Sequence, residues 1–337
     1  MSVRSLHLAI LGCGTIARTH ARAVRALGGA VRLSFASRDA ARADAYCRDL
    51  GGAGSWGSYQ AAIADRSVDA VLVAVPPRFH RALTLEALDA GKHVMVEKPA
   101  FPAMDDFVAV QDARDRAGRQ VIVAENDHYK PLVRTLAGLV RDGAVGDMIF
   151  VRITTIAHRP KAADDWRNDE TMAGGDAFFE EGIHWLHIAG SLGPRIVRAH
   201  GVRPAVPRTG PDQRAKSMLA SFAYENGAAG AIFYSREAPV FFQGLSFSAI
   251  FGQAGVITFE SNGGLVVVRG RGLPRVMVPG VRDIRGYQAM HRDFVEAIRT
   301  GRPPEMSLER AMHDQRLMEQ IYAGLAPEAG AARPPAR

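Results

Sequence analysis

The stretch Leu6-His7-Leu8-Ala9-Ile10-Leu11-Gly12-Cys13-Gly14-Thr15-Ile16-Ala17 decides the fold of this 337-residue chain. A short apolar run, typical of a buried strand, enters the pattern G-x-G-x-x-A, and a helical segment follows it. In this pattern Gly12 permits a tight turn, Gly14 lets the backbone approach a pyrophosphate, and the small Ala17 lets the helix pack on the strand. The N–H groups at the start of the helix attract phosphate oxygens. The 34 glycines of the chain make such strings common, but the position between strand and helix favours a dinucleotide site at Gly12, Gly14, Thr15, Ile16 and Ala17.

Short apolar runs and amphipathic segments alternate over the first third of the chain. We expect strands at 6–11, 31–36, 70–75, 93–96 and 120–124, and helices at 16–27, 40–50, 59–64, 81–90 and 104–117. Gly91 and Gly118 stand where two of these helices end and tolerate positive φ there. This alternation is typical of a parallel sheet with crossover helices, so the sequence predicts a doubly wound Rossmann domain over residues 1–126.

The texture of the sequence changes after about residue 126. Helices are expected at 132–141, 176–191, 287–300 and 308–325, and strands at 148–157, 196–203, 216–224, 228–235, 243–251, 255–260, 264–269 and 275–278. Turn signals such as Glu225-Asn226-Gly227 separate the later strands and indicate an antiparallel meander. The sequence therefore predicts an α/β chain whose second part, 127–325, is an α+β domain. The tail 326–337, rich in Ala, Pro and Gly, is predicted to be disordered.

The bulk properties of the chain are those of a soluble globular protein with two domains. No apolar run reaches the length of a membrane-spanning helix, and the first residues lack the apolar region and cleavage site of a secretory signal. The net charge is +7, but the arginines are scattered, so we expect neither a nucleic-acid partner nor a membrane partner. The two cysteines, Cys13 and Cys47, have no metal-type spacing and indicate a reducing compartment, the cytoplasm.

The segment Phe35-Ala36-Ser37-Arg38-Asp39 stands at the end of the second expected strand, where the ribose of a dinucleotide is recognised. Chains that bind NAD usually place Asp or Glu there for the 2′-hydroxyl, whereas a small hydroxyl followed by a guanidinium suits a 2′-phosphate. We predict that Ser37 and Arg38 bind that phosphate with Arg42 as a helper, so that NADP(H) is favoured over NAD(H). Asp39 could turn back to the ribose, but it also suits the N-cap of the next helix.

The run Glu97-Lys98-Pro99 lies at the carboxyl end of the expected strand 93–96, where ligands bind in open α/β sheets. A lysine near an oxidised nicotinamide meets a like charge and partial burial, and both favour its use as a proton acceptor. A lone lysine before a helix would otherwise be a surface residue. The position at a strand end makes a catalytic role for Lys98 the alternative to that surface role.

Several segments together resemble the Gfo/Idh/MocA family, the glucose–fructose oxidoreductase and inositol dehydrogenase family. They are the glycine loop, V-L-V-A-V-P-P at 71–77 with His80, A-G-K-H-V-M-V-E-K-P at 90–99, Trp166-Arg167, Gly174-Gly175, Glu180-x-Gly182-x-His184 and 294–303. The resemblance covers nearly the whole chain, and E-K-P is its most specific part. It implies an NAD(P)-dependent oxidoreductase with Lys98 as a catalytic residue. It also implies a second domain with a large open, mostly antiparallel sheet that binds substrate and forms a homodimer or homotetramer.

The resemblance also implies contacts around the cofactor. Those expected at the cofactor are Val75, Pro76, His80, Glu97 and Lys98, with Asn126 near the nicotinamide ribose or the substrate. Arg167 is expected at cofactor or substrate oxygens, with a surface ion pair as the alternative. Tyr129 is expected to pack, Tyr287 could line the cleft, and the Lys98–Pro99 peptide bond could be cis.

A helix with Asp176 as its N-cap carries the second group of candidate residues. Glu180 and His184 are one turn apart and share a helix face. Family members usually carry aspartate where this chain has Glu180, glycine where it has Asp176, and aspartate where it has His187. The resemblance assigns a catalytic role to His184, and Glu180 is expected to orient the substrate or raise the basicity of His184. A buried structural histidine is the alternative for His184 and the expectation for His187.

Glu180, His184 and His187 also stand at i, i+4 and i+7, a spacing that can ligate a divalent ion. His128 or His158 could supply a further ligand. Because no other ligand is obvious in the sequence, we expect no metal.

The favoured function is reversible oxidation of a secondary alcohol on a sugar, polyol or related cyclic substrate, with NADP(H) and with Lys98, His184 and Glu180 as catalytic residues. One alternative is a lyase, isomerase or glycosidase that oxidises and then re-reduces one carbon with bound cofactor. Another is a non-catalytic NADPH-binding regulatory protein that has lost the chemistry of the altered helix.

Overall fold

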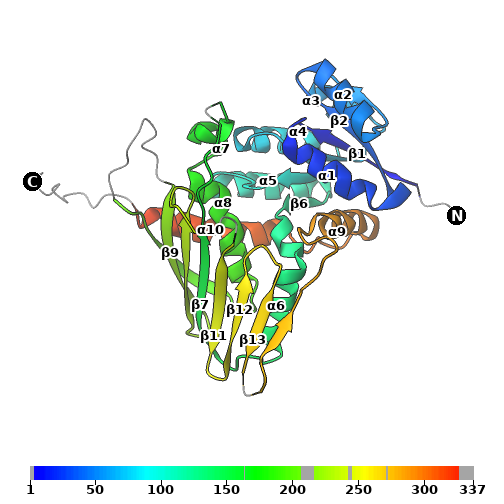
Figure 1. Ribbon diagram of the computed structural model, residues 1–337. Coiled ribbons are helices and arrows are strands. Elements are labelled where there is room, and N and C mark those ends of the chain that lie inside the picture. Colours follow the sequence, from blue (N-terminus) through cyan, green and yellow to red (C-terminus); the bar gives the residue numbers. More distant parts are fainter. Residues whose placement is uncertain (1–3, 163, 206–215, 242–244, 271, 326–337) are drawn as a thin grey trace, which may run out of the picture.

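Two sheets with helices packed on them make up the computed structural model of the chain, which describes residues 4–162, 164–205, 216–241, 245–270 and 272–325 (Figure 1). The predicted disorder of 326–337 lies outside the described residues. Within the described ranges, no helix is both long and apolar enough to span a membrane.

The first sheet is six-stranded and entirely parallel, in the order β3-β2-β1-β4-β5-β6. Its strands are β1 (Leu6–Leu11), β2 (Val31–Ala36), β3 (Ser55–Trp56), β4 (Ala70–Val73), β5 (His93–Glu97) and β6 (Val121–Ala124). Strands β1, β4 and β6 are buried throughout, as continuous apolar runs in a sheet covered on both faces should be. The predicted Rossmann sheet is confirmed. The sequence missed β3, because two residues are too few to show a pattern.

The helices of the first part lie close to their expected positions. They are α1 (Thr15–Arg25), α2 (Ala40–Leu50), α3 (Tyr59–Ala64), α4 (His80–Asp89) and α5 (Met104–Ala117), with short 3-10 turns η1 (Gly28–Ala30) and η2 (Pro77–Phe79). The side chain of Asp39 caps α2 by accepting from the Arg42 N–H at 3.2 Å. Gly118 ends α5 with a φ of +60°, as expected of a C-cap.

The second sheet has eight strands, and its order, β14-β13-β12-β11-β7-β10-β9-β8, corrects the predicted meander. The strands are β7 (Met148–Ile156), β8 (Ile196–Val202), β9 (Ser217–Tyr224), β10 (Ala229–Ser235), β11 (Phe247–Gly252), β12 (Gly255–Glu260), β13 (Val266–Arg269) and β14 (Arg275–Met277). Strand β7 separates two meanders, because it lies parallel to β10 and antiparallel to β11. Turn signals report only neighbours along the chain, so they could not reveal this non-local pairing.

The remaining helices are α6 (Pro131–Arg141), α7 (Glu170–Ala173), α8 (Ala177–Gly190), α9 (Tyr287–Thr300) and α10 (Leu308–Ala323), with turns η3 (Asn126–Tyr129) and η4 (Trp166–Asn168). Helices α6, α8 and α10 share one buried core with the second sheet, as Leu136, Leu186 and Ile321 show. Helix α9 instead packs into the core of the first sheet through Met290 and Phe294. The division of the chain at residue 126 stays a prediction, and α9 shows that late residues also complete the first core.

Candidate active site

The glycine loop begins the site at the carboxyl end of β1. Gly12 has a φ of +113°, and a Cβ there would lie 2.3 Å from the carbonyl oxygen of Ala74, so only glycine fits. Gly14 is the N-cap of α1, with no side-chain cap and no acidic residue in the first turn. A Cβ on Gly14 would meet no atom within 4 Å. The free amides and the open approach fit the pyrophosphate of a dinucleotide.

Charged and hydroxyl side chains lie at the end of β2. Ser37 is buried, and its Oγ accepts from the Asp39 N–H at 3.2 Å. Because Asp39 caps α2, its carboxylate is directed to the Arg42 amide. Arg38 and Arg42 are exposed, and Arg38 lies 6.0 Å above the ring of Phe79. Two exposed guanidinium groups beside an engaged carboxylate suit a phosphate better than a ribose hydroxyl.

The end of β5 is held from inside the first sheet. The Lys98–Pro99 bond is cis, as expected. Glu97 is buried, and its carboxylate receives His20 Nε2 at 2.5 Å and the Lys98 N–H at 3.0 Å. His80, fully buried, bridges the carbonyls of Val75 and Ala100 at 2.7 and 2.9 Å. The side chains of Glu97 and His80 therefore hold the segments that follow β4 and β5 in place. That these two residues contact the cofactor stays a prediction.

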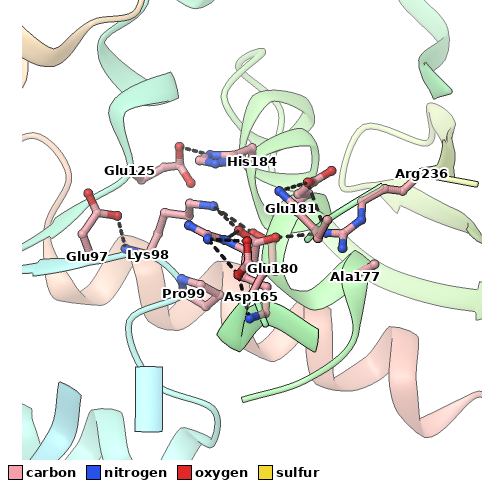
Figure 2. Close-up of polar contacts among 12 residues, drawn as sticks. Glu97, Lys98, Pro99, Glu125, Asp165, Ala177, Glu180, Glu181, His184 and Arg236 are labelled. Carbon is pink, nitrogen blue, oxygen red and sulfur yellow. Dashed lines mark hydrogen bonds and ion pairs between the residues drawn. The ribbon is translucent and has the colours of Figure 1, made fainter. Parts of the chain in front are cut away.

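Lys98 leaves β5 and reaches α8 (Figure 2). Its Nζ donates to the main-chain carbonyl of Glu180 at 3.0 Å and lies 3.7 Å from Oε1 of the same residue. The Glu180 carboxylate also accepts from Arg167 Nε at 3.2 Å and from Arg236 Nη1 at 3.3 Å. Arg167 is held in turn by Asp165 and stacks on Trp166. Glu180 thus joins three cations from separate elements.

The electrostatics of Glu180 follow from this arrangement. Burial alone would raise the pKa of the Glu180 carboxyl, but the charges of Lys98, Arg167, Lys161 and Arg236 outweigh it and lower that pKa to about 2. Glu180 is therefore ionised at every physiological pH. With both oxygens engaged, it is arranged as an anchor for cations rather than as a proton acceptor.

His184 stands one turn beyond Glu180 on α8 and contacts the end of β6 instead. Its Nδ1 lies 2.6 Å from Oε1 of Glu125, the residue directly after β6 (Figure 2). The Glu125 side chain is 2 % exposed and that of His184 is 18 % exposed. His184 is therefore the accessible member of a buried carboxylate–imidazole pair.

His187 points away from Glu180 and His184, so these three residues do not form the metal site that their spacing allowed. Its Nδ1 lies 2.7 Å from Asp314 Oδ2 on α10 and its Nε2 lies 3.0 Å from His128. His187 is buried, as expected for a structural histidine. Three residues along a helix correspond to about 300° of rotation, so the spacing alone did not bring its ring to the ring of His184.

Another group could hold a cation. Ligand atoms of Glu125, Asp127 and His184 lie within 4.8 Å of one another. However, Asp127 already accepts from Asn126 Nδ2 at 2.9 Å and from Lys130 Nζ at 2.7 Å. A cationic lysine beside the group favours a hydrogen-bonded network over a metal cage.

The other expected positions are also placed. Asn126 is buried and donates to the Arg285 carbonyl at 2.8 Å. Tyr129 packs in the core, where its hydroxyl donates to Asp293 at 2.6 Å. Tyr287 lies edge-on against His20 rather than free in a cleft. Val75 and Pro76 are half-buried, and Val75 lies beside Gly12.

Sequence reasoning missed Glu125 and Arg236. Glu125 had a signal, because it follows a buried strand at the sheet edge where ligands bind. Arg236 had none, since its partner Glu180 lies 56 residues away. Its guanidinium is buried, and its contact with Glu181 at 3.3 Å adds a second anchor on α8.

The comparisons with known proteins agree with this architecture. The model of the oxidoreductase family with an NAD-binding Rossmann fold matches residues 6–125, and that of the GFO/IDH/MocA C-terminal domain matches residues 133–258. D-xylose 1-dehydrogenase (NADP(+)) 2 of Haloferax volcanii is 27% identical over 311 residues, 89% of this chain and 90% of that protein. 1,5-anhydro-D-fructose reductase of Ensifer adhaerens is 33% identical over 178 residues, 52% of this chain and 53% of that protein.

Among solved structures, the aldose-aldose oxidoreductase of Caulobacter crescentus in complex with glycerol is similar, with a TM-score of 0.84 and 25% identity over 95% of this chain and 97% of that chain. Two consecutive domain models of one family, the relatives and the fold all agree. The chain belongs to the Gfo/Idh/MocA family and is an NAD(P)-dependent oxidoreductase.

Proposed function

We propose that this protein is an NADP(H)-dependent oxidoreductase acting on a secondary alcohol or ketone of a sugar, polyol or related cyclic substrate. The observation that carries the proposal is Lys98, which crosses from β5 to α8 and donates to Glu180 at 3.0 Å, one turn from the accessible His184. The xylose dehydrogenase and anhydrofructose reductase among the relatives support a sugar-like substrate.

The residues of the chain would share the chemistry as follows. The nicotinamide, when bound, supplies the hydride acceptor or donor. Gly12, Gly14 and the start of α1 would hold its pyrophosphate. Lys98 and His184 would bind the reacting oxygen, proton transfer would take place at this pair, and Glu180 would keep Lys98 in place. The proton that alcohol oxidation releases would pass from the accessible imidazole of His184 to solvent, and ketone reduction would take one up by the same route.

Replacing Lys98 with Met tests the catalytic role. We expect kcat to fall by about 10²- to 10³-fold, because a positioned cationic donor to the reacting oxygen is lost, while the Kd for NADPH stays within about threefold of its value in the unchanged protein. Lys92→Met is the matched control, since Lys92 stands at the other end of β5 and binds the carbonyls of Asp65 and Val68. Near-normal turnover by Lys98→Met would contradict the role. Turnover of substrate without net change in nicotinamide absorbance would favour an isomerase or lyase instead.

The preference for NADP(H) is proposed from Ser37, Arg38 and Arg42. Loss of one charge-assisted hydrogen bond costs about 1.5–3 kcal/mol, which is about 10- to 150-fold in affinity. Arg38→Ala should therefore lower the affinity for NADPH by that factor and leave the affinity for NADH nearly unchanged, as measured by fluorescence titration. Tighter binding of NADH than NADPH by the unchanged protein would refute the preference.

The open face of the second sheet is proposed as the contact between copies of the chain. Phe150, Phe233 and Phe251 are 57%, 43% and 37% exposed on β7, β10 and β11, which are neighbours in the sheet. Phe150 and Phe251 are directly paired across two strands. An aromatic patch of this kind is typical of an interface between subunits, which supports a homodimer or homotetramer.

A further inference from the structure

Among the residues that the structure describes, three buried carboxylate–histidine pairs lie around the two cores. Glu97 pairs with His20 at 2.5 Å, Asp314 with His187 at 2.7 Å, and Glu125 with His184 at 2.6 Å. The imidazoles of His20 and His187 are 0% and 2% exposed, so no substrate can reach them. Only His184, at 18% exposed, combines a buried carboxylate partner with an accessible ring.

The charge of Glu125 is compensated differently from that of its neighbours. Its Oε1 receives the Asp127 N–H at 3.0 Å as well as His184, and its buried Oε2 has no hydrogen-bond partner among the described residues. Asp127 has Lys130, and Glu180 has three cations. Across the part of the chain that the structure describes, Glu125 has no Lys or Arg within ion-pair distance. The imidazole of His184 is therefore the side chain placed to donate a hydrogen bond to this buried carboxylate.

We propose that Glu125 is the positioning residue that makes His184 the proton carrier of the reaction, an inference that rests on the proposed function. The Nδ1–H of His184 donates to Glu125, which fixes the tautomer and leaves the lone pair of Nε2 on the accessible side. In alcohol oxidation the O–H bond of the substrate would break and an Nε2–H bond would form, while the C–H hydrogen would leave as hydride to the bound oxidised nicotinamide. The imidazolium then stands against the Glu125 carboxylate, and ketone reduction returns the proton.

This arrangement separates the roles of two residues. Lys98 donates to Glu180 and remains available as a cationic hydrogen-bond donor to the substrate oxygen. His184 alone then changes its proton count. Glu180, the residue that replaces the usual aspartate of the family, acts on Lys98 and not on His184, because among the described residues its carboxylate contacts Lys98, Arg167 and Arg236.

Nitrogen NMR on the unchanged protein tests the tautomer without any need for turnover. With ¹⁵N-labelled histidine, and with the His184 signals assigned by their loss in His184→Asn, neutral His184 should carry its proton on Nδ1. In Glu125→Gln the amide can instead donate to Nδ1, so the proton should move to Nε2. An Nε2–H tautomer in the unchanged protein overturns the proposal, even if the variant does not fold.

Steady-state kinetics with NADPH and the substrate supply the second measurement. Glu125→Gln should lower kcat by about 10²- to 10⁴-fold, as loss of the correct tautomer does, with KM and the Kd for NADPH within about threefold. Asp314→Asn is the matched control, because it alters the inaccessible pair of His187, and it should keep kcat within about threefold once folded. A kcat of Glu125→Gln near that of the unchanged enzyme overturns the proposal, as does one equivalent of bound divalent metal that this variant loses. Failure of the proposed function would look different, since the unchanged protein would then turn over no sugar or polyol.

Discussion

Replacing Glu180 with Gln measures how much the ion pairs of this carboxylate contribute to the free energy of unfolding. The pKa of Glu180 falls from an ordinary 4.5 to about 2 in the folded protein, where its side chain is only 10% exposed. A fall of this size corresponds to about 3 kcal/mol of stabilisation at neutral pH. Because the folded pKa lies below the unfolded one, the stabilisation is complete above about pH 4.5 and is lost as the pH falls towards 2. We therefore expect Glu180→Gln to lower the free energy of unfolding by about 3 kcal/mol at pH 7 and by about 2 kcal/mol at pH 3.5.

Equilibrium unfolding in urea at the two pH values is the assay. Glu225→Gln is the control, because Glu225 pairs with Arg195 at 3.7 Å on the surface, where the side chains are 50% and 67% exposed. Its effect should stay below about 0.5 kcal/mol, since exposed ion pairs contribute little. A loss below about 1 kcal/mol for Glu180→Gln at pH 7, or the same loss at both pH values, would refute the electrostatic account of this cluster.

Two further predictions concern the glycine loop and the open sheet face. Gly12→Ala should destabilise the protein by about 2–3 kcal/mol or prevent folding. The φ of +113° is strained for alanine, and its Cβ would also lie only 2.3 Å from the carbonyl oxygen of Ala74. Gly14→Ala should leave the thermal unfolding midpoint nearly unchanged, since its Cβ would meet no protein atom within 4 Å. It should weaken NADPH binding about tenfold or more, because the added methyl group would stand where the backbone approaches the phosphates. A stable Gly12→Ala variant, or a Gly14→Ala variant that binds NADPH normally, would count against these roles. Phe150→Asp, at a position 57% exposed on β7, should shift the protein to monomers in sedimentation velocity, and an unchanged oligomer would exclude this face as the contact.

Local signals in the sequence predicted most of the fold. The apolar run before Gly12 and the alternation after it gave the order and type of the elements in the first sheet, and helices α2, α3 and α5 have the expected bounds. Caps such as Asp39 and Asp176 could be predicted because capping uses residues within three positions of the helix start. The order of the second sheet could not be predicted, because β7 pairs with strands that lie far along the chain.

In the candidate site, too, local patterns could be predicted from the sequence and long-range contacts could not. Lys98 and His184 were predicted from motifs, since each sits on a short pattern at the end of a strand or in a helix. Their contacts were not, because hydrogen bonds such as Lys98 to Glu180 span 82 residues and His184 to Glu125 span 59. Arg236 follows the strand β10 (Ala229–Ser235), whose sequence gives no sign of a buried charge, so its role could not be predicted for the same reason.

The sequence by itself determined the glycine turn, the parallel sheet that follows it and the residue types available for chemistry, because each depends on neighbours within a few positions. Only the tertiary structure decided which carboxylate serves which cation or imidazole. The helix that carries Glu180, His184 and His187 directs them to three different partners, and those partners come from strands and helices that meet only when the chain is folded.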